Sequence, residues 1–223
     1  MESILIAILF FLPGTPQSSG VEYLDKVWSQ FSGIKDYTVD VRVHFDVKEL
    51  QSPDMQATIY YKAPDKVRVK SKGLFIMPRE AGVFNPSKFN PSDYTAAVED
   101  TLTYGGNPAV EVSVAPKKKG EEDRKLILVI DEKDWLVREI KTPPSSGKKV
   151  RARITYATVD GFNLPSEMDV TFDVNKTDGE IPNPGRDRRR LGGVSGSVQI
   201  YYSNYRVNTG LSDEIFKREE GSR

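Results

Sequence analysis

The sequence contains no cysteine and a single histidine, His44. Without cysteine the protein forms no disulfide and has no thiol for a lipid anchor, so packing alone must stabilise it. The scarcity of these residues also removes the parts of zinc sites and of Ser-His-Asp or Cys-His catalytic groups. His44 occupies a polar position in an alternating segment, where an ordinary exposed histidine is expected. We therefore expect no enzyme activity, no metal and no cofactor.

An excess of charge of one sign is also missing. The 32 basic and 32 acidic residues cancel, so the protein has no overall field that would attract nucleic acid. The hydrophobic content of 38% and the length of 223 residues are typical of a folded protein with one domain.

A long apolar run occurs only near the start, where Ile4–Leu12 is nine consecutive apolar residues. Nine helical residues are too few to cross a hydrocarbon core of about 30 Å, but they suit the apolar part of a secretory signal. Ser18 and Gly20 suit positions −3 and −1 of a cleavage site, although no Lys or Arg precedes the run. We expect residues 1–20 to be a cleaved signal peptide, with a buried N-terminal strand or helix as the alternative.

Residues 21–223 are expected to form a single domain that begins with an amphipathic helix. The stretch from Val21 carries one apolar stripe at helical spacing, and Gly33 suits its C-terminal end. From Tyr37 to Lys48 apolar and polar residues alternate strictly, as in a strand with one exposed face. Further segments that predict strands are 55–61, 66–70, 74–77, 109–115, 126–130, 135–141, 150–156, 168–174 and 198–207, with a closing helical turn over 211–216.

A second helix is predicted over residues 93–102, with Ser92 as its cap. Asp131, Glu132 and Asp134 fall in a hairpin tip, where we expect them to be solvated. Antiparallel strands with one apolar face need a cover, which helices supply. The sequence therefore predicts a mainly β protein with helices (α+β), in which a curved antiparallel sheet carries the helices on its concave side. Its apolar faces are either a dry core or a ligand-binding surface.

Residues 176–196 interrupt the strand pattern with five glycines, two prolines and four arginines. The segment is far longer than a usual hairpin loop. One interpretation is a flexible insertion. The other is a contact surface for lipid headgroups or an acidic partner, formed by Arg186, Arg188, Arg189 and Arg190.

Three segments resemble the LolA/LolB lipoprotein-carrier family and its wider LolA-like relatives. In YYKAPDKVRV (Tyr60–Val69) a strand ends in a proline and restarts with an apolar-basic-apolar step. DGFNLPSEMDV (Asp160–Val170) resembles the family's late hairpin. YSNYRVNTGLSDEIF (Tyr202–Phe216) resembles its final strand, Asn-x-Gly-Leu turn and closing phenylalanine. The chain departs from the best-known carriers at Ala63, where they have an arginine, and at FIMPREAGVFNP (75–86), which replaces a tryptophan-bearing segment.

The resemblance implies an incomplete antiparallel β-barrel with a helical lid, whose apolar interior takes acyl chains. It implies a periplasmic carrier that binds acyl chains of lipoproteins or lipids and moves them toward the outer membrane, between an inner-membrane donor and an outer-membrane acceptor. The absence of cysteine argues against the membrane-anchored branch, and we expect a soluble monomer. The alternative is a lipid-responsive sensor or adaptor that regulates a membrane partner through its long loop. The residues expected to line the acyl cavity and its lid are Trp28, Phe31, Val41, Val43, Phe45, Ile59, Tyr61, Val67, Val69 and Leu74.

Overall fold

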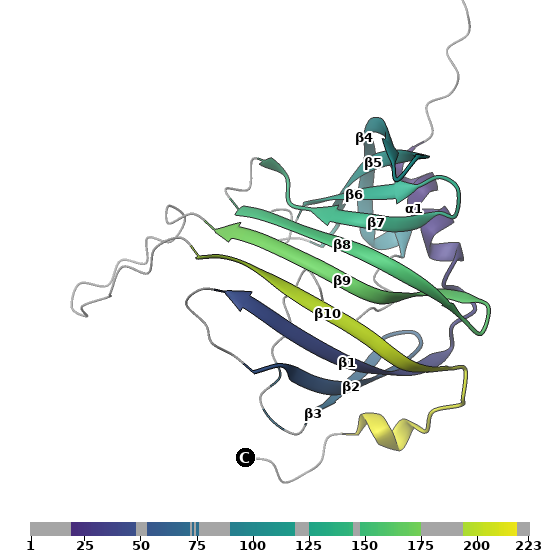
Figure 1. The fold of residues 1–223 in the computed structure, drawn as a ribbon. Helices are drawn as coiled ribbons and strands as arrows, with labels where there is room; N and C mark the ends of the chain where they lie inside the picture. The colour runs from purple at the N-terminus through teal and green to yellow at the C-terminus, as the bar shows by residue number, and fades with distance from the viewer. Residues whose placement is uncertain are drawn as a thin grey trace, which may run out of the picture.

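The computed structural model describes residues 19–47, 53–71, 73, 75, 90–118, 125–144, 148–174 and 194–217. These residues form one α-helix, ten strands and two 3₁₀ helices (Figure 1). In chain order the elements are α1 (Gly20–Ser29), β1 (Asp36–Val47), β2 (Met55–Lys62), β3 (Lys66–Ser71), η2 (Pro91–Asp93), β4 (Tyr94–Tyr104), β5 (Asn107–Pro116), β6 (Leu126–Asp131), β7 (Leu136–Lys141), β8 (Lys148–Val159), β9 (Phe162–Val174), β10 (Val194–Val207) and η5 (Asp213–Phe216).

All ten strands belong to one sheet, in the order β3-β2-β1-β10-β9-β8-β7-β6-β5-β4. Every neighbouring pair is antiparallel. β1 and β10 pair inside the sheet although they come from opposite ends of the chain, while β3 and β4 form its two edges. Figure 1 shows a curved, open sheet. The mainly β class and the curved antiparallel sheet predicted from the sequence are therefore confirmed.

The alternation in β1 separates a buried face from an exposed one. Tyr37 and Val43 are 0% exposed, whereas Arg42 and His44 are exposed. Directly paired residues of an antiparallel sheet share a face, so the buried face continues across the neighbouring strands. It forms one cluster of buried apolar residues that draws on eight of the ten strands, and we call it the inner face. Half-buried side chains of β4 pack against it. A one-residue shift in the pairing of β1 would move its buried valines to the solvent face of the sheet. The cost of exposing them fixes the register of the strand.

Residues 94–102 belong to the strand β4 and Asp93 to η2, so the helix predicted over 93–102 is wrong. β4 pairs with β5 through a turn at Gly105 and Gly106, both of which have positive φ. Along β4 the side chains alternate between half-buried and exposed positions, and its threonines and valine favour a strand. Ser92 lies inside η2, which Asn90 caps. Pairing with β5 gives the backbone N–H and C=O groups of β4 hydrogen-bond partners across the sheet. A single serine suited to cap a helix does not outweigh these hydrogen bonds.

α1 is shorter than the predicted helix and begins one residue earlier. Ser19 is its N-cap and accepts a hydrogen bond from the backbone N–H of Glu22. The helix ends at Ser29, and Gly33 follows it in a turn. Ser19 and Gly20, which the sequence placed in the signal peptide, therefore belong to the start of a folded helix. The cleavage of a signal peptide stays a prediction, and residues 1–18 lie outside the described residues.

α1 packs against β4 and β5, at one end of the sheet. Its side chains Leu24 and Val27 are buried there. A helical lid over the expected acyl-contacting residues of β1 and β2 would lie near the β3 edge of the sheet. α1 therefore does not occupy the position expected for the lid helix. A helical cover of the whole inner face stays a prediction. No helix among the described residues is long and apolar enough to cross a membrane.

The remaining predicted strands are present, several of them longer than expected. β6 and β7 form the predicted hairpin, and β8 and β9 meet at Asp160 and Gly161, which have positive φ. The closing helical turn is η5. The strand predicted over 74–77 lies outside the described elements. Residues 194–196, assigned to the long loop, belong to β10 instead.

The turn after β10 is tied to the start of β1. The backbone N–H groups of Thr209 and Gly210 donate to the carboxylate of Asp36 at 2.9 and 3.0 Å. The side-chain oxygen of Asn208 accepts from the backbone N–H of Lys35 at 2.7 Å. The Asn-x-Gly-Leu segment, on which part of the family resemblance rests, is thus a structural turn that ties the end of β10 to the start of β1.

Candidate functional site

The inner face of β1 and β2 holds five of the residues expected to contact acyl chains. Four of them are at most 2% exposed: Val41, Val43, Ile59 and Tyr61. Phe45 is half-buried and packs against the same cluster. In this structure the apolar face of these strands is a closed interior.

The edge strand β3 continues the inner face but leaves it open to solvent. Val67 pairs directly with Tyr61 and Val69 pairs with Ile59, so all four side chains share one face. Val67 and Val69 are nevertheless 37% and 38% exposed, and the described part of the chain exposes no other large apolar side chain to this extent. The inner face therefore has an apolar margin at β3.

The two aromatic residues expected in the lid have different surroundings. Phe31 is 2% exposed and belongs to the core cluster. Trp28 is half-buried and lies outside that cluster. Leu74 and the four arginines of the long loop lie outside the described residues, so their roles stay predictions.

A cluster of five tyrosines lies within the interior, on β1, β2, β8 and β10. Tyr37 stacks on Tyr61 with ring centroids 5.2 Å apart, and Tyr205 meets Tyr37 edge-on at 5.9 Å. Tyr156 and Tyr202 complete the cluster. Negative charge on either of them would raise the pKa of Tyr205, and charge on Tyr202 would also raise that of Tyr156. Of these five tyrosines, only Tyr61 was among the site residues expected from the sequence.

A bulge in β10 brings Tyr202 and Tyr205 to the same face although their spacing is three. Between Thr38 and Asp40 of β1 lies one residue, whereas the paired stretch of β10 holds two, Asn204 and Tyr205. Asn204 has a φ of 54°, which suits a bulge. The sequence gives only a weak signal for this bulge, an asparagine that interrupts the alternation of β10. Only the pairing with β1 shows where the additional residue lies.

Burial changes the acidity of the whole cluster. Loss of water raises the pKa of Tyr37, Tyr202 and Tyr205 well above its ordinary value near 10. It also raises the pKa of Tyr61 and Tyr156, the first of which lies close to the carboxylate of Asp65. The phenols therefore stay neutral at physiological pH, and they present hydroxyl groups to an otherwise apolar space.

The hydroxyl groups of the cluster differ in their partners. Tyr205 donates to the backbone carbonyl of Pro165 at 2.9 Å and Tyr156 donates to that of Val137 at 2.9 Å. The hydroxyl of Tyr202 is buried and has no hydrogen-bond partner in the described residues. Buried polar groups are usually paired, so this one is an exception to be explained.

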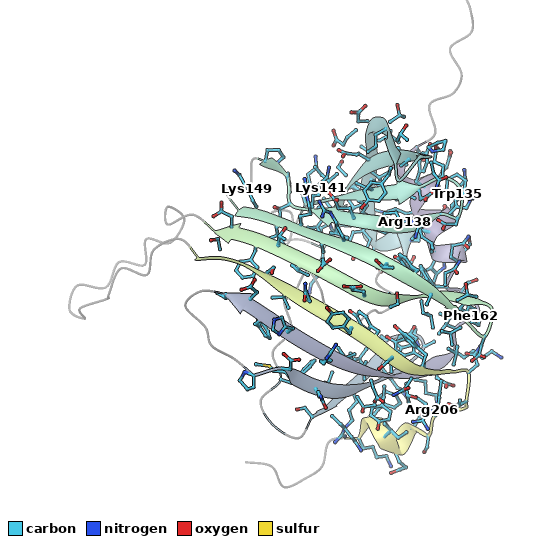
Figure 2. All side chains as sticks on the ribbon, viewed as in Figure 1. Trp135, Arg138, Lys141, Lys149, Phe162 and Arg206 are labelled. Atoms are coloured by element: carbon cyan, nitrogen blue, oxygen red, sulfur yellow. The ribbon has the colours of Figure 1, made fainter. Side chains whose placement is uncertain are left out.

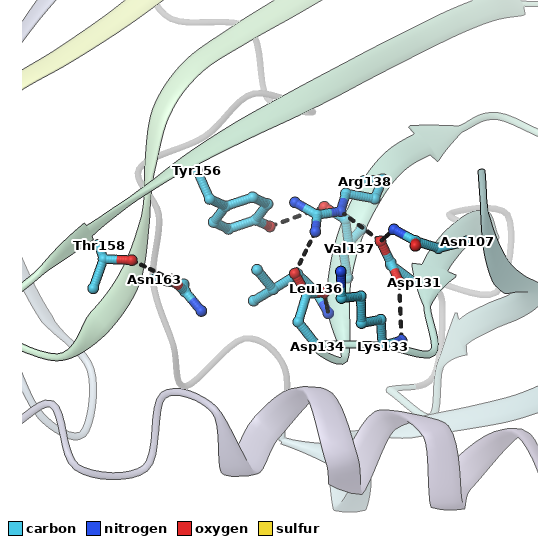
Figure 3. Close-up of polar contacts among 10 residues, drawn as sticks. All are labelled: Asn107, Asp131, Lys133, Asp134, Leu136, Val137, Arg138, Tyr156, Thr158 and Asn163. Carbon is cyan, nitrogen blue, oxygen red and sulfur yellow. Dashed lines mark hydrogen bonds and ion pairs between the residues drawn. The ribbon is translucent and has the colours of Figure 1, made fainter. Parts of the chain in front are cut away.

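A polar cluster organises the β6–β7 turn, close to Tyr156 (Figure 3). Asp131 is 2% exposed, which shows that the expectation of a solvated side chain was wrong for this residue. Its carboxylate accepts from Arg138 Nε at 3.3 Å, from Asn107 Nδ2 at 3.2 Å and from the backbone N–H of Lys133 at 2.9 Å. Arg138 also pairs with Asp134. The carboxylate is buried because the turn folds its own donors around it.

This turn holds α1 through aromatic contacts. The Tyr23 hydroxyl donates to Glu132 Oε1 at 3.0 Å, and the Tyr23 ring lies 6.1 Å from that of Trp135. The ammonium group of Lys26 stands 3.9 Å from the centre of the Trp135 ring, within the range of a cation–π contact. Figure 2 shows Trp135 and Arg138 at the end of the sheet where α1 lies. The cluster therefore anchors the helix, and we assign it a structural role.

A hollow of about 1220 Å³ opens beside β1, β2 and β3, and most of its lining side chains are on the exposed face of these strands. There the Arg42 guanidinium lies 4.7 Å from the Tyr201 ring, and His44 Nδ1 is 2.7 Å from Asp54 Oδ1. Of the expected acyl-contacting residues that the structure describes, only Val41 lines it. Ten of its fifteen lining residues carry polar or charged side chains, and for this reason we do not assign acyl chains to it. The described residues contain no group of three or more His, Cys, Asp or Glu suited to a metal ion.

No family model matches the sequence, and no curated protein matches it. Solved structures do share its fold. A domain from Vibrio parahaemolyticus, described as an outer membrane lipoprotein-sorting protein, is 12% identical, with 88% of this chain and 95% of that chain covered and a TM-score of 0.63. A LolA superfamily protein from Nitrosomonas europaea is 13% identical, with 91% and 99% covered and a TM-score of 0.60.

A third structure, a DUF1329 family protein from Desulfovibrio piger, is 14% identical, with 90% of this chain and 98% of that chain covered and a TM-score of 0.58. Identities of this size are evidence of a shared fold only. The resemblance to LolA-like proteins noted in the sequence is thus confirmed at the level of the fold: the described chain shares the fold of this LolA superfamily protein and of this lipoprotein-sorting domain.

Proposed function

We propose that this protein is a periplasmic carrier that binds acyl chains of lipoproteins or other lipids and moves them toward the outer membrane. The observation that carries the proposal is the continuous apolar inner face of an open, curved sheet. The shared fold with a lipoprotein-sorting domain supports it. The activity proposed is binding and transport, not catalysis.

The inner face suits an acyl chain because its walls are apolar and carry few directional groups. Burying a methylene group contributes about 0.8 kcal/mol, so a long chain gains affinity from contact area alone. The residues proposed to supply this contact are Val41, Val43, Phe45, Ile59 and Tyr61, with Phe31, Trp28 and Leu74 as further contacts.

The interior is closed in the structure, so an acyl chain must enter from a place where the inner face reaches solvent. The margin at Val67 and Val69 is such a place, because these exposed valines lie directly beside Tyr61 and Ile59. Contact with these two side chains lets an acyl chain begin to leave water before the interior opens. We propose that entry starts at β3.

The test is ligand content and uptake. Native mass spectrometry of the protein purified from cell envelopes should detect a bound acyl compound, and the ligand-free protein should take up a fluorescent acyl probe. Val69→Asp should weaken uptake of the probe several-fold, because it places a charge on the apolar margin. Lys70→Asp, on the opposite face of the same strand, is the matched control and should leave uptake unchanged. Recovery of empty protein that takes up no probe would refute the proposal.

A further inference from the structure

We infer that the hydroxyl of Tyr202 is the hydrogen-bond donor for the carbonyl oxygen of an acyl ester bound against the inner face. The inference rests on the proposed function, because it requires acyl chains to enter the interior. It adds a polar contact, and with it a chemical preference, to a surface that is otherwise apolar.

The first observation is the state of this hydroxyl. Tyr202 is 6% exposed, and its oxygen is the one buried side-chain polar atom without a partner in the described part of the chain. A buried hydroxyl that leaves water without a new partner destabilises the folded protein. Such a group is retained at a functional site when a ligand supplies the missing partner.

The second observation is that the fold does provide partners for comparable tyrosines. Tyr205 lies three residues further along β10 and its hydroxyl reaches the carbonyl of Pro165. The hydroxyl of Tyr156 reaches the carbonyl of Val137. Backbone acceptors are therefore available around the cluster, but the hydroxyl of Tyr202 is bonded to none of them.

The third observation is the place of Tyr202 on the sheet. It pairs with Val41 on β1, Val41 pairs with Ala57 on β2, and Ala57 pairs with Ser71 on the edge strand β3. This row carries the small side chains Ala57 and Ser71 and crosses three strand spacings, about 14 Å. It runs beside the row that contains Val69, so it connects the proposed entry margin with the hydroxyl along the inner face.

The chemistry of the surroundings selects the type of ligand group. Burial is the cause that raises the pKa of Tyr202, and no cation of the described residues opposes it. A carboxylate or phosphate at this point would therefore be an unpaired buried charge. A neutral ester carbonyl accepts one hydrogen bond and brings no charge, which matches the single donor available.

The experiment compares an ester with a hydrocarbon of similar length. Methyl palmitate and hexadecane are each titrated as competitors of a fluorescent acyl probe, on the wild-type protein and on Tyr202→Phe. We expect the variant to bind methyl palmitate about five-fold more weakly and hexadecane equally well, since one hydrogen bond is lost. Tyr205→Phe, whose hydroxyl already has a backbone partner, is the control and should leave the ratio of the two affinities unchanged.

Infrared spectroscopy gives a second readout on the wild-type protein. The carbonyl band of ¹³C-labelled methyl palmitate should shift to the lower frequency of a hydrogen-bonded ester and return in Tyr202→Phe. An unshifted band in the wild type overturns the inference even if the variant does not fold. Equal weakening of both competitors, or an unchanged ratio in Tyr202→Phe, also overturns it while the carrier function stands. If neither competitor binds the wild type, the proposed function fails and the inference fails with it.

Discussion

The two edges of the ten-stranded sheet end in different ways. At β4 the helix α1 lies against the strand so closely that a Cβ on Gly20 would come within 2.5 Å of the backbone of Ala96 and Ala97. At β3 the apolar side chains of Val67 and Val69 face solvent. One edge is thus fixed by a packed helix, and the other presents a margin of the inner face.

Under the proposed function, this difference divides the sheet into an end that stabilises the fold and an end that binds the ligand. The α1 end carries the buried carboxylate of Asp131 and the aromatic contacts of Trp135, which serve packing. The β3 end adjoins the tyrosine cluster with its unpaired hydroxyl. Changes at the first end should lower the free energy of unfolding, and changes at the second should alter ligand binding.

The largest effect is expected from alkaline pH, through the tyrosine cluster. Burial raises the pKa of these phenols, so above pH 10 the unfolded chain releases protons that the folded chain keeps. Stability is therefore complete below about pH 10 and falls above it, by about 1.4 kcal/mol per pH unit for each tyrosine that stays protonated. Urea unfolding and phenolate absorbance over the same pH series measure it. Titration of all ten tyrosines near pH 10 in the folded protein would contradict the expectation.

At the α1 end, Arg138→Met should lower the free energy of unfolding by about 3 kcal/mol, because it leaves the buried carboxylate of Asp131 without its charged partner. Urea denaturation gives the value. Arg153→Met is the control: its side chain is 58% exposed, and its partner Glu139 also pairs with Arg151. If the two variants are equally stable, the β6–β7 cluster does not hold this end together.

Gly20→Ala tests the close approach of α1 to β4. The new methyl group would meet backbone atoms, which cannot rotate away, so the helix must shift and about 2 kcal/mol should be lost. Gly73→Ala, where nothing lies within 4 Å, should change the free energy of unfolding by less than about 0.5 kcal/mol. Thermal and urea unfolding of both variants decide it. Full stability of Gly20→Ala would show that α1 is looser than the structure indicates.

The predicted cleavage of a signal peptide also bears on this end of the sheet. A protein that begins at Ser19 keeps the N-cap of α1, whereas one that begins at Val21 loses both the cap and Gly20. We expect the longer form to be more stable by about 1 kcal/mol. Sequencing of the N-terminus of exported protein should accordingly find a start at or before Ser19. A natural start at Val21 with undiminished stability would mean that the cap is dispensable.

The smallest effect on stability is expected at the β3 margin. The double substitution Val67→Thr and Val69→Thr should change the free energy of unfolding by less than about 0.5 kcal/mol, because both side chains are already exposed. Ile59→Thr, directly opposite Val69 but buried, should lower it by about 2 kcal/mol. Urea curves measured side by side test the contrast. Similar losses would mean that the margin is part of the core.

Much of the fold could be predicted because strand periodicity is a local signal. The alternation of Tyr37 to Lys48 identified both the strand and its buried face, and the segment at Asn208 identified the closing turn. The segment over 93–102 could not be assigned in this way, since its conformation depends on pairing with β5. The expected exposure of Asp131 failed for a related reason: the donors from Asn107 and Arg138 reach it only in the folded turn.

By itself the sequence determined the mainly β class, most of the antiparallel strands and the buried face of β1, because a period of two needs only neighbouring residues to be read. Tertiary structure alone decided three further features. The pairing of β1 with β10 set the bulge that turns Tyr202 and Tyr205 to the same side. Packing placed α1 on β4 and left Val67 and Val69 exposed. Each of these depends on contacts between residues far apart in the chain, which no local pattern encodes.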